Sequence, residues 1–318
     1  MDISGLQLKH ALVICSRDRA HNLLEMFSAI YAQNDSKFPA DIFLVLNMRS
    51  EEDYSLIVSS ISEYKGVNIR VLRTTRGLPS ARNLALQHLP DADVVHFLDD
   101  DVIVSPSYFQ DIEIFLHENL DVDGGAPIEG SNAKVAKPIK FKFLKQHLGL
   151  LQVPGLVSVS MRNYWGPTPN QKSFRVDWLP GLAMFYRRSA IQNSFFCEKL
   201  EAHTLGGYGL GEDLFFTLGL STRGIQLHGI PSLKVSHLRL PNVTNDSDYL
   251  HYAIGEMRAE LYEKFPQEFK LRYYFASLFF ELLIKTYHEP FQFLAYFKGY
   301  VGEVKGFITT LAKVRSEF

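Results

Sequence analysis

Four short apolar runs in the first hundred residues, each followed directly by polar or charged residues, constrain the fold most strongly. The runs cover residues 10–15, 41–46, 67–72 and 94–98, and each has the length of a buried strand. Apolar residues at helical spacing follow the first three, over about residues 23–31, 51–64 and 80–89, with Ser80 as the cap of the last helix. Strands that alternate with helices predict an α/β fold with a mostly parallel sheet covered on both faces.

The alternating pattern ends after the fourth run. Residues 124–180 are rich in Gly, Pro and Asn, and we expect loops with short strands there. A helix is predicted to begin near Glu212. Residues 250–318 have a helical pattern that Pro266 and Pro290 interrupt.

The composition is that of an ordinary globular chain of 318 residues, 46% of them hydrophobic, with a net charge of −2. This excludes wholesale disorder, a fibrous fold and bulk binding of nucleic acid. Two cysteines, Cys15 and Cys197, are too few for a disulfide framework or a Cys-based zinc cluster. Neither a secretory signal nor an apolar stretch of about 20 residues is visible, so we expect a cytoplasmic protein without a membrane span.

The polar residues that follow the four runs are the first candidates for a functional site. In an open parallel sheet, ligands bind beyond the carboxyl ends of the strands. The segments at these ends are Ser16–Arg19, Asn47–Arg49, Arg73–Gly77 and Asp99–Asp101.

The three consecutive aspartates 99–101 are the sharpest feature of the sequence. Adjacent carboxylates repel one another unless a positive charge lies between them. A hard divalent cation, Mg²⁺ or Mn²⁺, would relieve that repulsion and could still bind phosphate oxygens. A solvated Asp turn is the alternative, but the position at a strand end favours a ligand site.

A second pair of carboxylates, Glu212 and Asp213, follows the glycine-rich segment 206–211 at a predicted helix start. Glycine permits a tight turn, and the positive end of a helix dipole favours an ionised carboxylate. Such a carboxylate can accept a proton from a hydroxyl nucleophile. Helix capping alone explains the pair equally well when it is taken in isolation.

In order and spacing, these motifs resemble those of the family 2 glycosyltransferases over about residues 8–240. The matching segments are Cys15-Ser-Arg-Asp-Arg19, Gly77-Leu-Pro-Ser-Ala-Arg-Asn83, Phe97-Leu-Asp-Asp-Asp101, Trp178 to Arg188, Gly211-Glu-Asp213, Arg223-Gly224 and Val235-Ser-His237. The resemblance implies a Rossmann-like GT-A fold with a C-terminal helical extension. It also implies transfer of a sugar from a nucleotide diphosphate-sugar to an acceptor hydroxyl, with inversion, in glycan or polysaccharide synthesis.

The resemblance also implies roles for individual residues. Asp101 would hold the metal ion against the diphosphate, with His237 as a second ligand or a structural residue. Asp213 would be the general base, and Glu212 the alternate base or an acceptor-binding residue. The implied donor-binding residues are Ser16, Arg17, Asn47, Gly77, Arg82, Asp99 and Asp100. The implied acceptor-binding residues are Trp178, Gly181 and Glu212, although a core position for Trp178 stays open.

Asn47 departs from the family's pattern. Many relatives carry an Asp-Asp-Gly-Ser stretch after the second strand, whose acid binds the base, whereas this chain has Asn47-Met-Arg-Ser50. Asn lacks the carboxylate acceptor for a uracil imide. UDP stays the first expectation for the donor nucleotide, with GDP and dTDP open.

The implied glycosyltransferase domain covers residues 1–245, with a nucleotide-sugar half over about 1–123, an acceptor half over about 124–245, and a C-terminal helical region over 246–318. Residues 265–307 hold nine Phe and five Tyr. Packing of a helix pair explains these aromatics best, while a homodimer contact or a peripheral contact with the inner face of a membrane stays open. Lys137–Lys145 has four lysines among apolar residues, a pattern that fits phospholipid, a lipid-linked glycan acceptor or a solvated strand edge.

Two other classes of function fit parts of the pattern. A sugar-phosphate nucleotidyltransferase would be expected to carry a glycine-rich loop directly after the first strand, but residues 16–19 contain no glycine. A non-catalytic sugar- or nucleotide-binding module needs no base, whereas this chain has both groups of carboxylates. The sequence therefore favours a metal-dependent inverting glycosyltransferase and leaves its sugar, acceptor, linkage and oligomeric state open.

Overall fold

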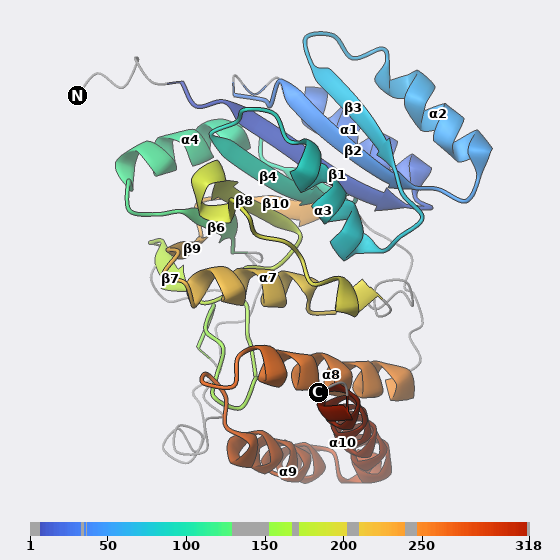
Figure 1. Ribbon diagram of the computed structural model, residues 1–318, viewed down its shortest axis with the longest axis vertical. Coiled ribbons are helices and arrows are strands. Elements are labelled where there is room, and N and C mark those ends of the chain that lie inside the picture. Colours follow the sequence, from blue (N-terminus) through green and yellow to red (C-terminus); the bar gives the residue numbers. More distant parts are fainter. Residues whose placement is uncertain are drawn as a thin grey trace. The chain divides into compact units, whose positions relative to one another are not determined.

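The computed structural model describes residues 7–32, 35, 37–128, 153–166, 172–201, 210–238 and 247–316. The chain divides into two compact units. Unit 1 contains residues 1–133, 166–205 and 212–241, and unit 2 contains residues 134–165, 206–211 and 242–318. The sheet belongs to unit 1 and the long C-terminal helices to unit 2 (Figure 1). The domain boundary near residue 245, and the division of the first domain into halves, stay predictions.

Unit 1 is built on a sheet whose eight described strands have the order β3-β2-β1-β4-β8-β6-β9-β7. The strands are β1 His10–Arg17, β2 Asp41–Asn47, β3 Asn68–Arg73, β4 Val94–Asp99, β6 Gly124–Pro127, β7 Phe174–Val176, β8 Ala183–Arg187 and β9 Leu227–Ile230. The pairs among β1 to β4 are parallel, as predicted. Strand β8 runs antiparallel to both of its neighbours, and β7 is antiparallel to β9.

Helices cover both faces of the parallel part of the sheet. They are α1 Ala20–Ala32, α2 Glu51–Ile61, α3 Leu78–His88 and α4 Tyr108–Glu118. Helices α1, α2 and α4 share one apolar core with residues such as Leu12 and Ile14 of β1. Helix α3 also contacts β1 and β2 but contributes nothing to that core, because it packs on the opposite face (Figure 1).

Helix α3 begins before the predicted cap. Its N-cap is Gly77, Pro79 lies in its first turn, and Ser80 is already inside the helix. The prediction that Ser80 caps this helix is therefore wrong. Proline suits the first helical turn, where its missing N–H removes no intrahelical hydrogen bond and its fixed φ is already helical.

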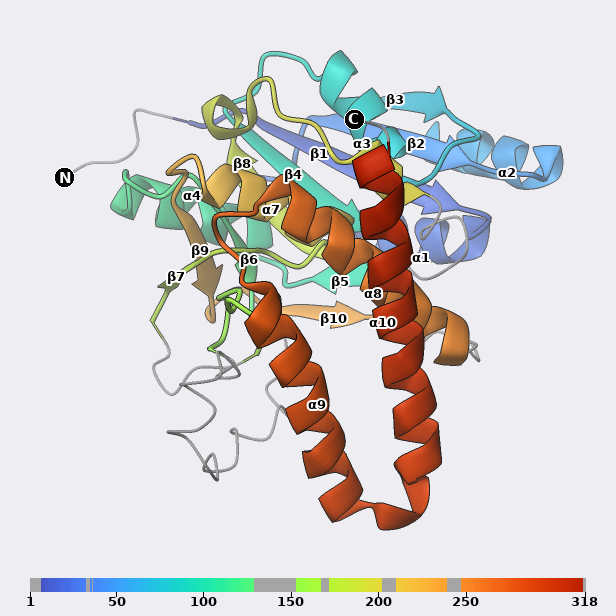
Figure 2. The same ribbon diagram turned by 60° about the horizontal axis from the view of Figure 1, so that its bottom comes forward.

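Unit 2 contains the predicted C-terminal helices, α8 Ser247–Lys264, α9 Leu271–His288 and α10 Phe293–Ser316. Figure 2 shows α9 and α10 as an antiparallel hairpin joined by the short helix η3, Pro290–Gln292. The predicted breaks near Pro266 and Pro290 are confirmed. None of the helices in the described ranges combines the length and the apolar character that a membrane crossing needs.

Helices α8 and α10 approach each other closely at glycines. A Cβ atom at Gly306 of α10 would overlap the backbone oxygen of Tyr252 in α8, and a Cβ at Gly255 would overlap the backbone oxygen of Glu303. Backbone atoms in packed helices cannot move aside without moving the whole helix. The crossing therefore depends on hydrogen in place of a side chain at these two positions.

We expect Gly306→Ala to destabilise unit 2 by about 1–3 kcal/mol, because overpacking forces the two backbones apart. Gly299→Ala on the same helix is the matched control. Its Cβ would meet only the ring of His251, at 2.7 Å, and a side chain can rotate away. That variant should be neutral or stabilised, since alanine favours a helix by roughly 1 kcal/mol over glycine. Urea unfolding measures the free energy of unfolding of both variants. Equal values for Gly306→Ala and Gly299→Ala would contradict the close approach of the two helices.

Candidate active site

Hydrogen bonds join the polar segments that follow the parallel strands. The backbone N–H of Asp18 donates to the backbone oxygen of Asn47 at 3.2 Å, and Asn47 Nδ2 donates to the backbone oxygen of Arg76 at 2.8 Å. Ser16 Oγ donates to Asp100 Oδ2 at 2.6 Å. The four segments predicted from the strand ends therefore lie together at one edge of the sheet.

Arg19 bridges two of the three consecutive aspartates. Its Nη1 atom lies 3.1 Å from Asp100 Oδ1 and 3.1 Å from Asp101 Oδ2. Burial raises the pKa of Asp100, while the hydrogen bond from Ser16 and the charge of Arg19 oppose that rise. No role for Arg19 is predicted from the sequence. Its position in a strand-end segment, with a charge opposite to that of the aspartates, was the available signal.

Arg82 of α3 is the buried centre of the site. Its Nη2 atom donates to Asp99 Oδ1 and to the backbone oxygen of Gly181, both at 3.1 Å. Its Nη1 atom lies 3.5 Å from Glu212 Oε1. The residue is 2% exposed, and its guanidinium carbon lies 5.2 Å from the ring centre of Phe196. Arg82 thus connects the end of β4 with the start of α7, Glu212–Ser221.

Two backbone N–H groups fix the Asp213 carboxylate. Asp213 Oδ2 accepts from Gly181 N at 2.8 Å, and Oδ1 accepts from Leu214 N at 2.7 Å. A carboxylate oxygen has two lone pairs, so each oxygen can still accept a proton or a second hydrogen bond. Burial raises the pKa of Asp213, and these two hydrogen bonds and the nearby Arg82 oppose the rise.

Glu212 is more enclosed than Asp213. Its Oε2 atom is buried, with no hydrogen-bond partner among the residues that the structure describes. Burial, followed by repulsion from Asp213, raises the pKa of Glu212 to about 7, and Arg82 limits the rise. Two adjacent carboxylates in one low-dielectric environment therefore bind a proton more readily than isolated ones.

The other predicted residues occupy different surroundings. Gly77 donates its backbone N–H to Glu201 Oε1 at 3.1 Å, which gives Glu201 a role that the sequence did not indicate. Arg17 is exposed, whereas Trp178 is only 7% exposed. A Cβ at Gly181 would make a tight contact, since it would lie 3.1 Å from Arg82 Nη2. The donor- and acceptor-binding roles of these residues stay predictions.

His237 belongs to β10, Val235–His237, which pairs with β5, Val102–Val104. In that pair His237 is opposite Val102, and the backbone N–H of Leu238 donates to the backbone oxygen of Asp101 at 2.7 Å. The chain around His237 is therefore a neighbour of the chain around Asp101. The segment Lys137–Lys145, predicted to meet a lipid or the acceptor, lies outside the described residues.

The aspartates fit a divalent cation that takes its remaining ligands from a diphosphate. Arg19 Nη1 already lies between Asp100 and Asp101, so their oxygens can share one positive charge. Within the described ranges, no three His, Cys, Asp or Glu side chains surround one point as metal ligands. Mg²⁺ commonly uses only one or two carboxylates and completes its coordination with phosphate oxygens and water.

Comparison with protein families identifies the chain. Residues 9–262 match the family model described as "Glycosyltransferase like family 2". This match covers most of the chain, so the chain belongs to that family and is a glycosyltransferase. A search of the curated proteins found no match.

Solved structures with the same fold are glycosyltransferases. GalNAc-T7 with UDP, GalNAc and Mn²⁺ has a TM-score of 0.57 at 14% identity, over 82% of this chain but 51% of that chain, so the present chain spans about half of it. The mannosyltransferase PcManGT from Pyrobaculum calidifontis, in complex with GDP-Man and Mn²⁺, has a TM-score of 0.56 at 12% identity. The match covers 96% of this chain and 88% of that chain. Residues 1–349 of S. aureus TarS, in complex with UDP-GlcNAc, have a TM-score of 0.50 at 14% identity. The match covers 98% of this chain and 92% of that chain. These similarities confirm the GT-A fold.

We expect Arg82→Met to destabilise the protein by about 3–5 kcal/mol near pH 8, because it removes the cation from a buried ion pair. The loss should be smaller near pH 5. The pKa of Glu212 is raised to about 7, so the folded state binds a proton there as the pH falls, and a neutral acid needs no cation. The control Arg73→Met, which breaks an exposed pair with Glu51, should leave stability almost unchanged. Urea unfolding at both pH values tests this, and a pH-independent loss would contradict it.

Proposed function

We propose that this chain is an inverting, metal-assisted glycosyltransferase that transfers a sugar from a nucleotide diphosphate-sugar to the hydroxyl of a glycan or lipid-linked glycan. One observation carries the proposal. Asp99 at the end of β4 and Glu212 at the start of α7 share the buried Arg82. A site for a charged diphosphate and a group able to accept a proton thus belong to one connected cluster.

In the proposed reaction, the acceptor oxygen attacks the anomeric carbon of the donor sugar. A new carbon–oxygen bond forms as the bond from that carbon to the diphosphate oxygen breaks, and the nucleoside diphosphate leaves with the bonding electrons. Asp213 takes the proton of the acceptor hydroxyl. A positioned base of this kind typically contributes about 10²–10⁴-fold to the rate.

The two carboxylates of α7 suit different roles. The backbone N–H groups of Gly181 and Leu214 hold Asp213 in one orientation and oppose protonation of its carboxylate. Glu212 is more buried, and burial and repulsion from Asp213 raise the pKa of its carboxyl, so it holds a proton more readily than an ordinary glutamate. Asp213 is therefore the stronger candidate for the base, and Glu212 for holding Arg82 and the acceptor.

The donor phosphates would be held at the aspartates. Asp101, with His237 as a second ligand, would hold Mg²⁺ or Mn²⁺, which neutralises the charge that develops on the departing diphosphate. Arg19 lies at the same carboxylates and could contribute a further positive charge. Ser16 keeps Asp100 oriented through its short hydrogen bond.

The base of the nucleotide is the open part of the proposal. UDP is the first expectation, because the motif set resembles that of enzymes that often use it, and GDP and dTDP are the alternatives. Asn47 would lie against the base, although its Nδ2 already donates to the Arg76 oxygen. The proposal also includes a cytoplasmic position on the inner face of a membrane, where lipid-linked acceptors are available.

We expect Asp101→Ala to abolish the metal-dependent part of nucleotide binding, because a direct metal ligand is removed. Calorimetric titration of UDP, GDP and dTDP, with and without Mn²⁺, measures this part for each base. Asp91→Ala is the matched control, since it removes an exposed carboxylate that pairs with exposed Lys9. Unchanged Mn²⁺ dependence in Asp101→Ala, with normal unfolding, would show that the metal is held elsewhere.

We expect Asp213→Asn to lower kcat by about 10²–10⁴-fold while donor affinity stays nearly the same, because the interaction is used only in the transition state. Asn keeps one of the two acceptor oxygens, so a stability loss of about 1 kcal/mol is also expected. Glu212→Gln should mainly raise the KM for the acceptor.

A screen of UDP-, GDP- and dTDP-sugars for nucleotide release would first identify a working donor for these measurements. Because burial raises the pKa of Asp213, the wild-type rate should fall with decreasing pH earlier than for an ordinary aspartate. Near wild-type turnover in Asp213→Asn beside an inactive Glu212→Gln would reverse the two roles. Full activity in both variants would remove the pair from the mechanism.

A further inference from the structure

The α9–α10 hairpin of unit 2 exposes large apolar side chains to an unusual degree. Ten of the eighteen exposed large apolar residues in the described ranges lie between residues 275 and 308, so exposure is concentrated on one motif. Phe291, in the turn of the hairpin, is fully exposed. Single exposed apolar residues are ordinary, but a cluster of this size marks a contact surface.

Seven of these residues are here called the hairpin face. They are Phe275, Phe279, Leu283 and Tyr287 of α9, Phe291 of the turn, and Phe297 and Val301 of α10, each at least 40% exposed. The α9 residues recur every four positions, as do the two of α10, and residues four apart lie on the same side of a helix. Both rows therefore run along their helices.

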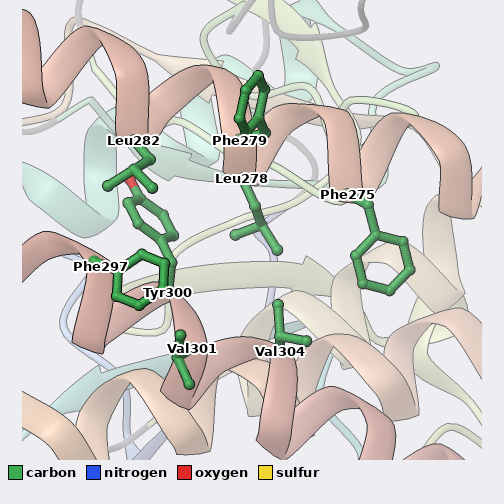
Figure 3. Close-up of a pocket in the computed structure, with 8 residues that line it drawn as sticks. All are labelled: Phe275, Leu278, Phe279, Leu282, Phe297, Tyr300, Val301 and Val304. Carbon is green, nitrogen blue, oxygen red and sulfur yellow. The ribbon is translucent and has the colours of Figure 1, made fainter.

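An apolar groove of about 280 Å³ connects the two rows. Figure 3 shows Phe275, Phe279 and Leu282 on α9 across from Phe297, Val301 and Val304 on α10. A groove open along its length between two helices can accept a narrow apolar chain more easily than a bulky polar group. Its lining contains no charged side chain.

Packing of the helices does not account for the hairpin face. The aromatic residues that do pack are others: Tyr274, Tyr300 and Phe307 are 0–6% exposed. Helix α8 packs mainly along α10, where its Gly255 meets residues 303 and 307. The expectation that packing explains the aromatics is therefore correct for one side of the hairpin only.

The exposed charges of the hairpin are almost all positive. Among its described side chains, the exposed basic ones are Arg272, Lys285, Lys298, Lys305 and Lys313, and Glu289 is the one exposed carboxylate. Two further acids are engaged internally, since Glu303 pairs with Arg258 and Glu281 lies 3.2 Å from Arg162. The exposed charged side chains of the hairpin are therefore mainly basic.

We propose that the hairpin face is a membrane-binding surface that lies in the headgroup region of an anionic bilayer. Its aromatic side chains and groove would enter the boundary with the acyl chains, and its lysines would meet anionic headgroups. Contact is interfacial, because no described helix can span a membrane. A second copy of this chain fits less well, since two such surfaces would bring like charges together.

Sedimentation of the full chain with lipid vesicles tests the proposal. Binding to vesicles with about 30% anionic phosphatidylglycerol should exceed binding to neutral phosphatidylcholine vesicles and should weaken with added salt. Donor and acceptor are absent from the assay, so its outcome does not depend on the proposed transfer reaction. Failure to bind anionic vesicles at low salt would overturn the proposal.

Phe291→Ser and Phe279→Ser should each weaken vesicle binding by about tenfold, the expected effect of losing one buried aromatic side chain. Phe195→Ser is the matched control, because Phe195 is 58% exposed but belongs to unit 1. All three variants should unfold at the wild-type temperature, since the residues are exposed. An equal loss in Phe195→Ser would show that binding is not specific to the hairpin.

Lys298→Gln and Lys305→Gln should each weaken binding to anionic vesicles by roughly fivefold and leave binding to neutral vesicles unchanged. Lys65→Gln, an exposed lysine of unit 1, should have no effect on either. Sedimentation equilibrium without lipid tests the alternative occupant. If the chain forms a dimer that Phe291→Ser dissociates, and if it does not bind vesicles, the surface is a contact with a second copy of the chain.

Discussion

The candidate site depends on the buried guanidinium of Arg82. Its partners are Asp99, Gly181 and Glu212, which are far apart in the sequence and come from different elements. A buried cation is costly unless opposite charges and hydrogen-bond acceptors surround it. The end of β4, the turn before β8 and the start of α7 are therefore coupled through one side chain.

The first half of the fold could be predicted because its signals are local. Each parallel strand is an apolar run, and each helix has apolar residues at helical spacing, as in the range that became α1. The antiparallel insertion of β8 between β4 and β6 could not be predicted, because strand order depends on long-range pairing rather than on the strand's own residues. Ser80 has a residue type that favours an N-cap, but Pro79 before it already belongs to the first helical turn, so the helix begins earlier.

The site was predictable where chemistry follows position along an element. Asp99–Asp101 follow a strand and Glu212 starts a helix, and both positions attract ligands in known ways. The partners were less accessible to sequence reasoning. Arg19, which lies between Asp100 and Asp101, and Glu201, which accepts from Gly77, become neighbours of those residues only through tertiary packing. The burial of Trp178 could not be predicted either, because a tryptophan in the sequence is compatible with a core position and with an exposed one.

In the α9–α10 hairpin, the sequence leaves open which apolar residues are buried, because α10 has apolar residues on more than one side. Its sequence alone does not say which side is inside. The buried pair of Glu303 with Arg258, together with Gly306 against α8, fixes that choice. Turning α10 about its axis would leave the buried Arg258 cation without its partner and would place a larger residue at the close approach to α8. Phe297 and Val301 are then left outside by geometry rather than by lack of hydrophobicity. A polar pair in the interior thus determines which apolar surface the protein presents to its surroundings.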